Sequence, residues 1–165
     1  MKITKILAVI SLIPIFLSGC FDSHSTREIS MLQAKGIIIC IQNKNSERLK
    51  SLFCDEIKSR DSIDSEIENL FNFIDGEIIS YDEFTVLGQS KNSTPEGIEE
   101  EGIGGNIHNI KTDTGKNYRL YFYSYHINKE YEDSVGVTDV TIFDEDTYDP
   151  EEGYPAYGKY SIVRD

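Results

Sequence analysis

The hydrophobic pattern of the chain changes its period at Gly76, and this change restricts the fold more than any other feature of the sequence. Before Gly76, apolar residues recur three or four positions apart, as they do on one face of a helix. After Gly76, segments rich in strand-forming residues alternate with turn residues. Helical stretches followed by strands predict an α+β domain, in which the helices pack on one face of an antiparallel sheet.

The clearest helical signal lies between Asp61 and Gly76. Asp61 or Ser62 can cap the start of this helix, and Gly76 can end it. Its apolar residues fall at positions i, i+4, i+7, i+8 and i+11 and are Ile63, Ile67, Leu70, Phe71 and Ile74. This spacing predicts a helix that faces the core.

Two weaker helical stretches precede it. The first begins near Arg27 and has one apolar face, formed by Met31, Ala34, Ile38 and Ile41. Its β-branched run, Ile37 to Ile39, could also form a buried strand, but we favour the helix. The second helix begins at Ser46, a good N-cap, and carries Leu49, Leu52, Phe53 and Ile57. We therefore expect three N-terminal helices.

Beyond Gly76 we expect a curved antiparallel sheet of about four strands. The Asp113–Lys116 turn joins two strand-like segments into a hairpin. The polar, glycine-rich stretch from Gly88 to Gly105 is typical of either a long connection or a mobile hairpin. The strand-forming segments are 79–86, with a break at Asp82-Glu83, then 107–112, 118–127, 135–143 and 160–163.

Cys40 and Cys54 are predicted to be small packing residues without a disulfide. If the first two helices form an antiparallel hairpin, the two cysteines are offset by roughly 7 Å along the helix axis. A separation between helices of about 8 to 10 Å adds to this offset. The two Cα atoms would then lie farther apart than a disulfide allows.

The N-terminus has the layout of a secretory signal. Lys2 and Lys5 precede a mostly apolar core from Ile6 to Leu17. This core is too short to span a bilayer, which takes roughly 20 apolar residues.

Leu17-Ser18-Gly19-Cys20 resembles the bacterial lipobox, in which the cysteine is acylated, for example with palmitate, and becomes the first residue after cleavage. We therefore predict a lipoprotein signal peptide over 1–19, a tether over 20–26 and a single domain over 27–165, of which 144–165 is an acidic C-terminal segment. The expected location is the extracytoplasmic face of the cell membrane, with Cys20 as the membrane anchor.

The charge of the chain makes nucleic acid an unlikely partner. The signal peptide removes two of the 16 basic residues and none of the 29 acidic ones, which leaves a formal charge of −15 on the mature part. Nucleic-acid binding depends on Lys and Arg side chains that neutralise phosphates. The acidic surface predicts a soluble domain that stands off from anionic lipids.

We find no arrangement of residues that predicts catalysis, a cofactor or a metal site. The three histidines, His24, His108 and His126, lack the spacing of a zinc site. The acidic stretch Asp144 to Asp149 lacks the glycine and the terminal glutamate of a calcium-binding loop. We expect it to be a solvated turn.

Alternation along 118–127 places Leu120, Phe122 and Ser124 on one face of a strand and Tyr121, Tyr123 and Tyr125 on the other. We assign the first face to the helices. The three tyrosines then lie on the outer face or line the mouth of the fold. They could bind a partner, since tyrosine is enriched at interfaces, or they could only stabilise cross-strand pairing.

Segments 49–53, 73–82 and 109–116 resemble an uncharacterised family of low-GC Gram-positive lipoproteins. Such proteins are similar to the cystatin-like, nuclear-transport-factor-2-like fold. The resemblance covers roughly residues 28–144 and implies a cone, in which helices fill the concave side of a curved antiparallel sheet. It brings no catalytic residues.

Two functional classes therefore compete. The first is a non-enzymatic binding module of the cell envelope, whose partner would be a protein, peptide, glycan or second copy in a homodimer. The second is a small-molecule enzyme that uses a cone-shaped pocket. Such an enzyme would bury His126 or His108 beside an aspartate, so a shifted histidine pKa in a closed cavity would distinguish the two.

Overall fold

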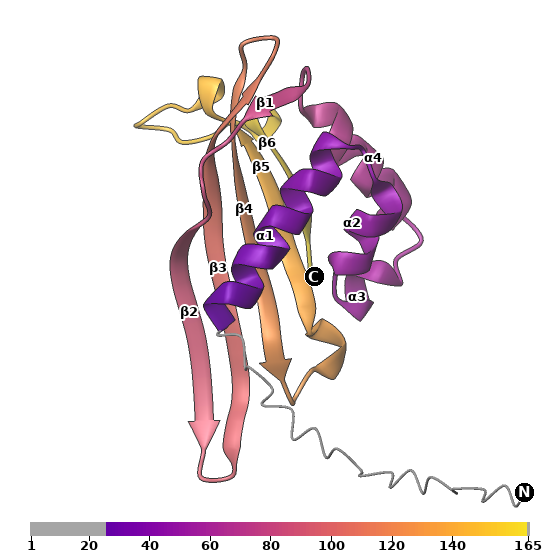
Figure 1. The fold of residues 1–165 in the computed structure, drawn as a ribbon, viewed down its shortest axis with the longest axis vertical. Helices are drawn as coiled ribbons and strands as arrows, with labels where there is room; N and C mark the ends of the chain where they lie inside the picture. Colours follow the sequence, from indigo (N-terminus) through magenta and orange to yellow (C-terminus); the bar gives the residue numbers. More distant parts are fainter. Residues whose placement is uncertain (1–25, 165) are drawn as a thin grey trace, which may run out of the picture.

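The computed structural model describes residues 26–164, so the predicted signal peptide, Cys20 and the tether up to residue 25 lie outside the described residues. The described part is an α+β fold (Figure 1). Its helices are α1 (Thr26–Gln42), α2 (Ser46–Leu52), α3 (Asp55–Lys58) and α4 (Ile63–Phe73). Its strands are β1 (Ile78–Ser80), β2 (Thr85–Thr94), β3 (Gly97–Thr112), β4 (Asn117–Asn128), β5 (Gly136–Asp144) and β6 (Lys159–Val163).

The strands form one antiparallel sheet of six strands, not about four. Its order is β1-β3-β4-β5-β6, and β2 also pairs with β3. The stretch from Gly88 to Gly105 belongs to a hairpin of β2 and β3 that turns at Pro95-Glu96, so the expected long connection is wrong and the hairpin is right. The polar composition of this hairpin reflects its exposure, because most of β2 faces solvent.

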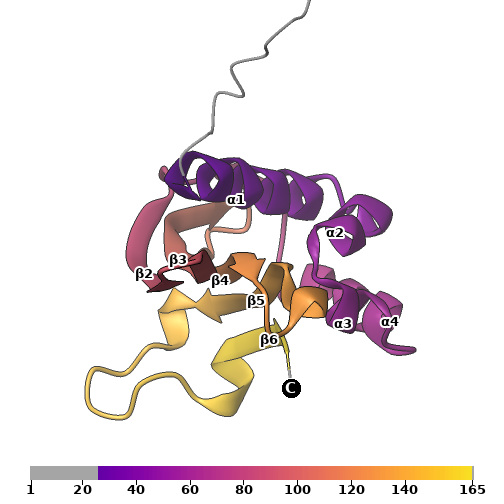
Figure 2. The same ribbon diagram turned by 90° about the horizontal axis from the view of Figure 1, so that it is seen from below.

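Within residues 26–164, the α-helices cover one face of the sheet and no α-helix lies on the other face. In Figure 1, α1 crosses the sheet diagonally, and α2, α3 and α4 lie beside it. Seen from below in Figure 2, the segment between β5 and β6 lies on the opposite side of the sheet from α1. We call the side without helices the outer face.

The run Ile37 to Ile39 is helical, and the inward face of α1 is apolar as expected. Ala34, Ile38 and Ile41 are buried, but Met31 is 41% exposed, in contrast to the prediction. Met31 lies on the edge of α1 that borders a surface hollow, where it adjoins Tyr81 and Phe84. The periodicity puts Met31 on the same face of the helix as the buried residues, but it does not show how far along α1 the rest of the fold covers that face.

The predicted second helix is broken in two, so residues 26–164 contain four α-helices where three were expected. Phe53 and Cys54 adopt extended backbone angles between α2 and α3. The Cys54 N–H donates to the Val137 carbonyl on β5 at 2.9 Å. This hydrogen bond attaches the segment between α2 and α3 to the sheet. The break thus gains a tertiary hydrogen bond that a continuous helix could not make.

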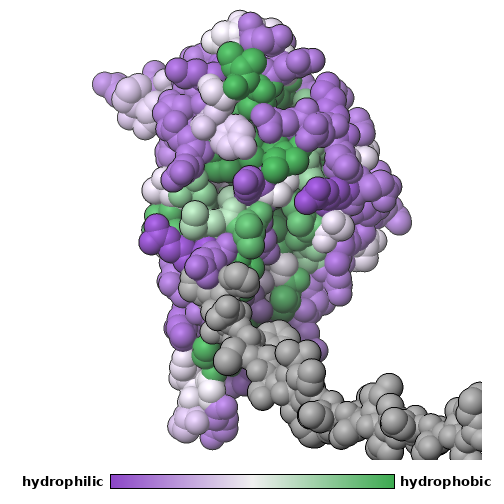
Figure 3. Space-filling model, in the orientation of Figure 1, coloured by the Kyte–Doolittle hydropathy of each residue, from purple (hydrophilic) through white to green (hydrophobic). Residues whose placement is uncertain are grey.

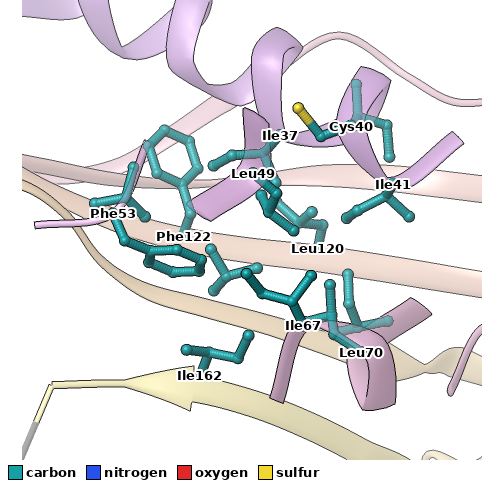
Figure 4. Packing of buried hydrophobic residues seen from close by; sticks show 14 of the residues in the cluster. Ile37, Cys40, Ile41, Leu49, Phe53, Ile67, Leu70, Leu120, Phe122 and Ile162 are labelled. Carbon is teal, nitrogen blue, oxygen red and sulfur yellow. The ribbon is translucent and has the colours of Figure 1, made fainter. Parts of the chain in front are cut away.

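The core lies between the helices and the inner face of β3, β4, β5 and β6 (Figure 4). The apolar face of α4 is buried as predicted, with all five residues at or below 8% exposure. Cys40 and Cys54 are both buried and free, so they serve as packing residues. Burial raises the pKa of the Cys40 thiol, which keeps it protonated and unreactive.

Candidate functional site

The two faces of β4 differ as the alternation predicted. Leu120, Phe122 and Ser124 are fully buried under the helices. Tyr121, Tyr123 and Tyr125 are half-buried on the outer face. We call these three residues the tyrosine ridge.

Glycines on β3 let the central ring of the ridge lie flat. Gly104 pairs with Tyr123, and Gly102 pairs with Tyr125. A Cβ atom on Gly102 would stand 2.5 Å from the Tyr123 hydroxyl, and one on Gly104 would stand 2.8 Å from a ring carbon of Tyr123. The Tyr123 ring therefore extends across β3 in space that only glycine leaves free. Its opposite face points away from the sheet.

Hydrogen bonds and ring contacts fix the ridge. The Tyr123 hydroxyl shares a 2.6 Å hydrogen bond with Ser90 Oγ on β2, and Ser90 Oγ donates to Glu100 at 3.2 Å. The rings of Tyr123 and Tyr125 meet edge to face with centroids 5.2 Å apart. Burial raises the pKa of Tyr121 and of Tyr125, so both phenols stay neutral at physiological pH.

Two shallow hollows flank the ridge. One has a volume of about 370 Å³ and lies over β2 and β3, where Leu87, Gly88 and Gly104 line it beside the rings. The other has a volume of about 210 Å³ and lies over β5 and β6. Tyr121 and Tyr123 line both, so the two hollows form one continuous surface across the outer face.

The smaller hollow contains an acidic and a basic side chain in addition to the rings. Asp139 on β5 lies directly opposite Tyr123 in the register. Burial raises the pKa of Asp139, and a hydrogen bond from Thr141 acts in the opposite direction. Arg164 lies with its guanidinium carbon 5.7 Å from the centre of the Tyr125 ring and pairs with Glu56 at 3.7 Å.

The acidic C-terminal segment packs on the outer face at the other end of β4. The guanidinium of Arg119 lies over the rings of Phe143 and Tyr154, at 4.7 and 5.4 Å from their centres. Arg119 also pairs with Glu145 at 3.1 Å, and the Tyr154 hydroxyl donates to Glu145 at 2.7 Å. Burial, together with that hydrogen bond, raises the pKa of Tyr154 to about 12. These contacts give the segment a structural role.

His126 lies on the inner face, against the first turns of α1. Its Nε2 is 2.9 Å from Ser30 Oγ, and burial lowers the pKa of the imidazole while Glu101 raises it. Ser30 Oγ donates its proton to the Thr26 carbonyl at 2.9 Å. The imidazole must therefore donate Nε2–H to Ser30, and this tautomer cannot take a proton from the serine. His126 lines none of the hollows described in this section.

The side covered by helices is mixed in character (Figure 3). Apolar surface there gathers along α1, next to a hollow of about 340 Å³ that Met31, Tyr81 and Phe84 border. Within residues 26–164 no helix is long and apolar enough to cross a membrane. The same residues contain no group of three or more metal-binding side chains, and the predicted acidic turn at Asp144 to Asp149 begins with a short 3₁₀ turn.

Residues 36–145, two thirds of the chain, match a family described as a domain of unknown function, DUF5104. The chain belongs to the DUF5104 family. No curated protein matches the sequence.

The DUF5104 match begins within α1 and ends directly after β5. It contains the tyrosine ridge, both glycines beneath it and Asp139. Strand β6, Arg164 directly after it and Ser30 all lie outside the match. The DUF5104 segment therefore supplies all the residues that line the two hollows except Val163 and Arg164.

The tyrosines were found from alternation alone, but the residues around them were not. Gly102, Gly104 and Asp139 reach the ridge only through strand pairing, and Arg164 only through β6. One signal was present: a strand with three glycines at 102, 104 and 105 indicates close approach of other atoms to the backbone.

Proposed function

We propose that the protein is a lipoprotein of a Gram-positive cell envelope, held at the extracytoplasmic face of the membrane by an acylated Cys20. Its domain, in this proposal, has the cystatin-like, nuclear-transport-factor-2-like architecture and is a non-enzymatic binding module. The partner is an envelope protein, a peptide or a glycan, or a second copy of the chain. The tyrosine ridge is the contact surface.

One observation carries the assignment to the ridge. The Tyr123 ring lies on glycine backbone with a hollow on each side, on the sheet face that no α-helix of residues 26–164 covers. Rigid aromatic rings offer a large contact area at low cost in side-chain entropy, which suits a binding surface.

The competing proposal is a small-molecule enzyme. It would need a histidine with a shifted pKa in a closed cavity, and His126 meets the first condition alone. Because its Nε2–H is committed to Ser30, the imidazole supports the seating of α1 better than it supports proton transfer to a ligand. This geometry favours the binding module.

The test is a comparison of crosslinking from intact cells. The triple variant Tyr121→Ser, Tyr123→Ser, Tyr125→Ser removes the ridge, and we expect it to lose the crosslinked species of the natural chain by tenfold or more. The matched control, Tyr131→Ser, Tyr148→Ser, Tyr157→Ser, removes three exposed tyrosines away from the ridge and should keep them.

Both triple variants are first checked for folding by circular dichroism and urea unfolding. If the ridge variant is folded and crosslinks as well as the control, the contact surface lies elsewhere and the proposal is wrong. If the ridge variant is unfolded, single Tyr123→Ser and Tyr125→Ser variants repeat the comparison.

A further inference from the structure

The smaller hollow beside the ridge contains an unusual combination of groups. Three tyrosine side chains and the carboxylate of Asp139 line it, together with Thr138, Val163 and Arg164. Its volume of about 210 Å³ is below the roughly 300–1,000 Å³ of sites that hold a drug-sized molecule. It has room for one side chain or a small organic group.

Asp139 has no basic partner within residues 26–164. Thr141 Oγ1 donates a hydrogen bond to Asp139 Oδ1 at 2.9 Å, and burial is the main influence on the pKa of Asp139 and raises it. Burying a carboxylate without a cation is unfavourable. The carboxylate would therefore gain from a positive charge placed in the hollow.

Arg164 shows that a cation is tolerated against these rings. Its guanidinium lies over Tyr125, but its ion pair is with Glu56 and not with Asp139. The electron-rich faces of aromatic rings attract cations within about 6 Å of the ring centre. Glu100 adds further negative charge near Tyr125.

From this geometry we propose that the hollow binds an organic ammonium group, such as the side chain of a lysine. The ammonium pairs with Asp139, and its methylene groups lie against Tyr121 and Tyr123. The inference rests on the proposed binding role of the ridge and names its ligand chemistry. An anionic group would meet Asp139 and Glu100, and an uncharged one would leave Asp139 without a counter-charge.

The proposal is tested by nuclear magnetic resonance of the domain with labelled tyrosine rings. The probes are Nα-acetyl-lysine methylamide, its uncharged norleucine analogue, its glutamate analogue, and n-butylamine. We expect saturable shifts of the ridge tyrosines with the lysine derivative and with n-butylamine, and at least tenfold weaker effects with the other two. Tighter binding of the lysine derivative would indicate a lysine in a peptide or protein as the ligand, and tighter binding of n-butylamine would indicate a free amine.

The variant Asp139→Asn keeps the acceptor for Thr141 and removes the charge. It should lower the affinity for the lysine derivative by about tenfold or more. The control Asp133→Asn, at an exposed acid in the connection between β4 and β5, should leave this affinity unchanged. The ring signals of buried Tyr118 report folding in each sample. Equal binding of lysine and norleucine derivatives, no saturable shift, or unchanged affinity in Asp139→Asn would each overturn the proposal.

This result is separate from the crosslinking test. Crosslinks that depend on the ridge, together with no ammonium binding, would refute the cation site alone. Ammonium binding together with crosslinks that do not depend on the ridge would refute the proposed partner surface.

Discussion

Two glycines on the β2–β3 hairpin differ in what a methyl group would meet. A Cβ on Gly105 would overlap the Phe84 ring and the Thr85 carbonyl oxygen, and the Thr85 carbonyl is backbone that cannot rotate away. The Phe84 ring in turn packs on Phe122 in the core, with centroids 5.2 Å apart. We expect Gly105→Ala to lower the free energy of unfolding by about 1–3 kcal/mol.

Gly88 is the matched control on the neighbouring strand. A Cβ there has no atom within 4 Å, and the residue has no positive φ. Gly88→Ala should be neutral or stabilising by about 0.5–1 kcal/mol, since alanine loses less backbone entropy on folding. Urea unfolding measures the free energy of unfolding of both variants. Equal changes in the two variants would show that the packing around Phe84 does not limit position 105.

At this scale the sequence predicted which residues share a face but not which residues meet across strands. Alternation within β4 is local, so the buried Leu120 and Phe122 and the outer tyrosines followed directly. The position of Tyr123 over glycine depends on the register between β3 and β4, and the position of Asp139 opposite Tyr123 depends on the register between β4 and β5. Register is set by bulges, such as the one between Tyr123 and Ser124 on the β5 side, which no local pattern shows.

At the scale of elements, the contact between α1 and β4 should respond to pH. Burial holds the pKa of His126 below its ordinary value of about 6.5. Between the two values the unfolded chain binds more protons than the folded one, so the free energy of unfolding falls as the pH drops from about 7 to 5. His126 faces Ser30 on α1, Ser124 on its own strand and Glu101 on β3.

The variant His126→Gln can still donate to Ser30 but does not titrate. We expect its free energy of unfolding at pH 7.5 to lie within about 1 kcal/mol of the natural chain, the typical net value of one hydrogen bond. Its decrease between pH 7.5 and 5 should be smaller, as measured by urea unfolding at both values. Other groups, including Asp139, contribute equally to both proteins and cancel in the difference. An identical pH slope in the two proteins would contradict this account.

Element prediction succeeded where a segment's own pattern decides its structure. The inward face of α4 was predicted correctly because five apolar residues repeat with helical spacing over the twelve positions from 63 to 74. The break at Phe53-Cys54 was missed because its cause, the hydrogen bond to Val137, lies more than 80 positions away in the sequence. The stretch from Gly88 to Gly105 was left open between a connection and a hairpin, because the polar, mostly exposed β2 has no alternation that marks a strand.

At the scale of the whole molecule, the proposed location makes a direct prediction. Cys20→Ala removes the thiol that would be acylated, so the protein should leave the membrane fraction or remain unprocessed with residues 1–19 attached. Fractionation and mass spectrometry of the intact protein distinguish these states. Cys40→Ala, which changes a buried thiol, is the control and should stay membrane-bound. A mature, membrane-bound Cys20→Ala protein would contradict the lipid anchor.

The pairing of the strands has a consequence for the order in which the molecule is assembled. From β2 onward, each strand pairs with the next one in the chain, so each pairing closes a local loop, and the entropic cost of closure grows only slowly with loop length. Ser30 and His126, in contrast, stand 96 positions apart. In a chain that emerges from its N-terminus first, α1 is therefore made early, and its hydrogen bond to β4 can form only after the 96 positions up to His126 have followed.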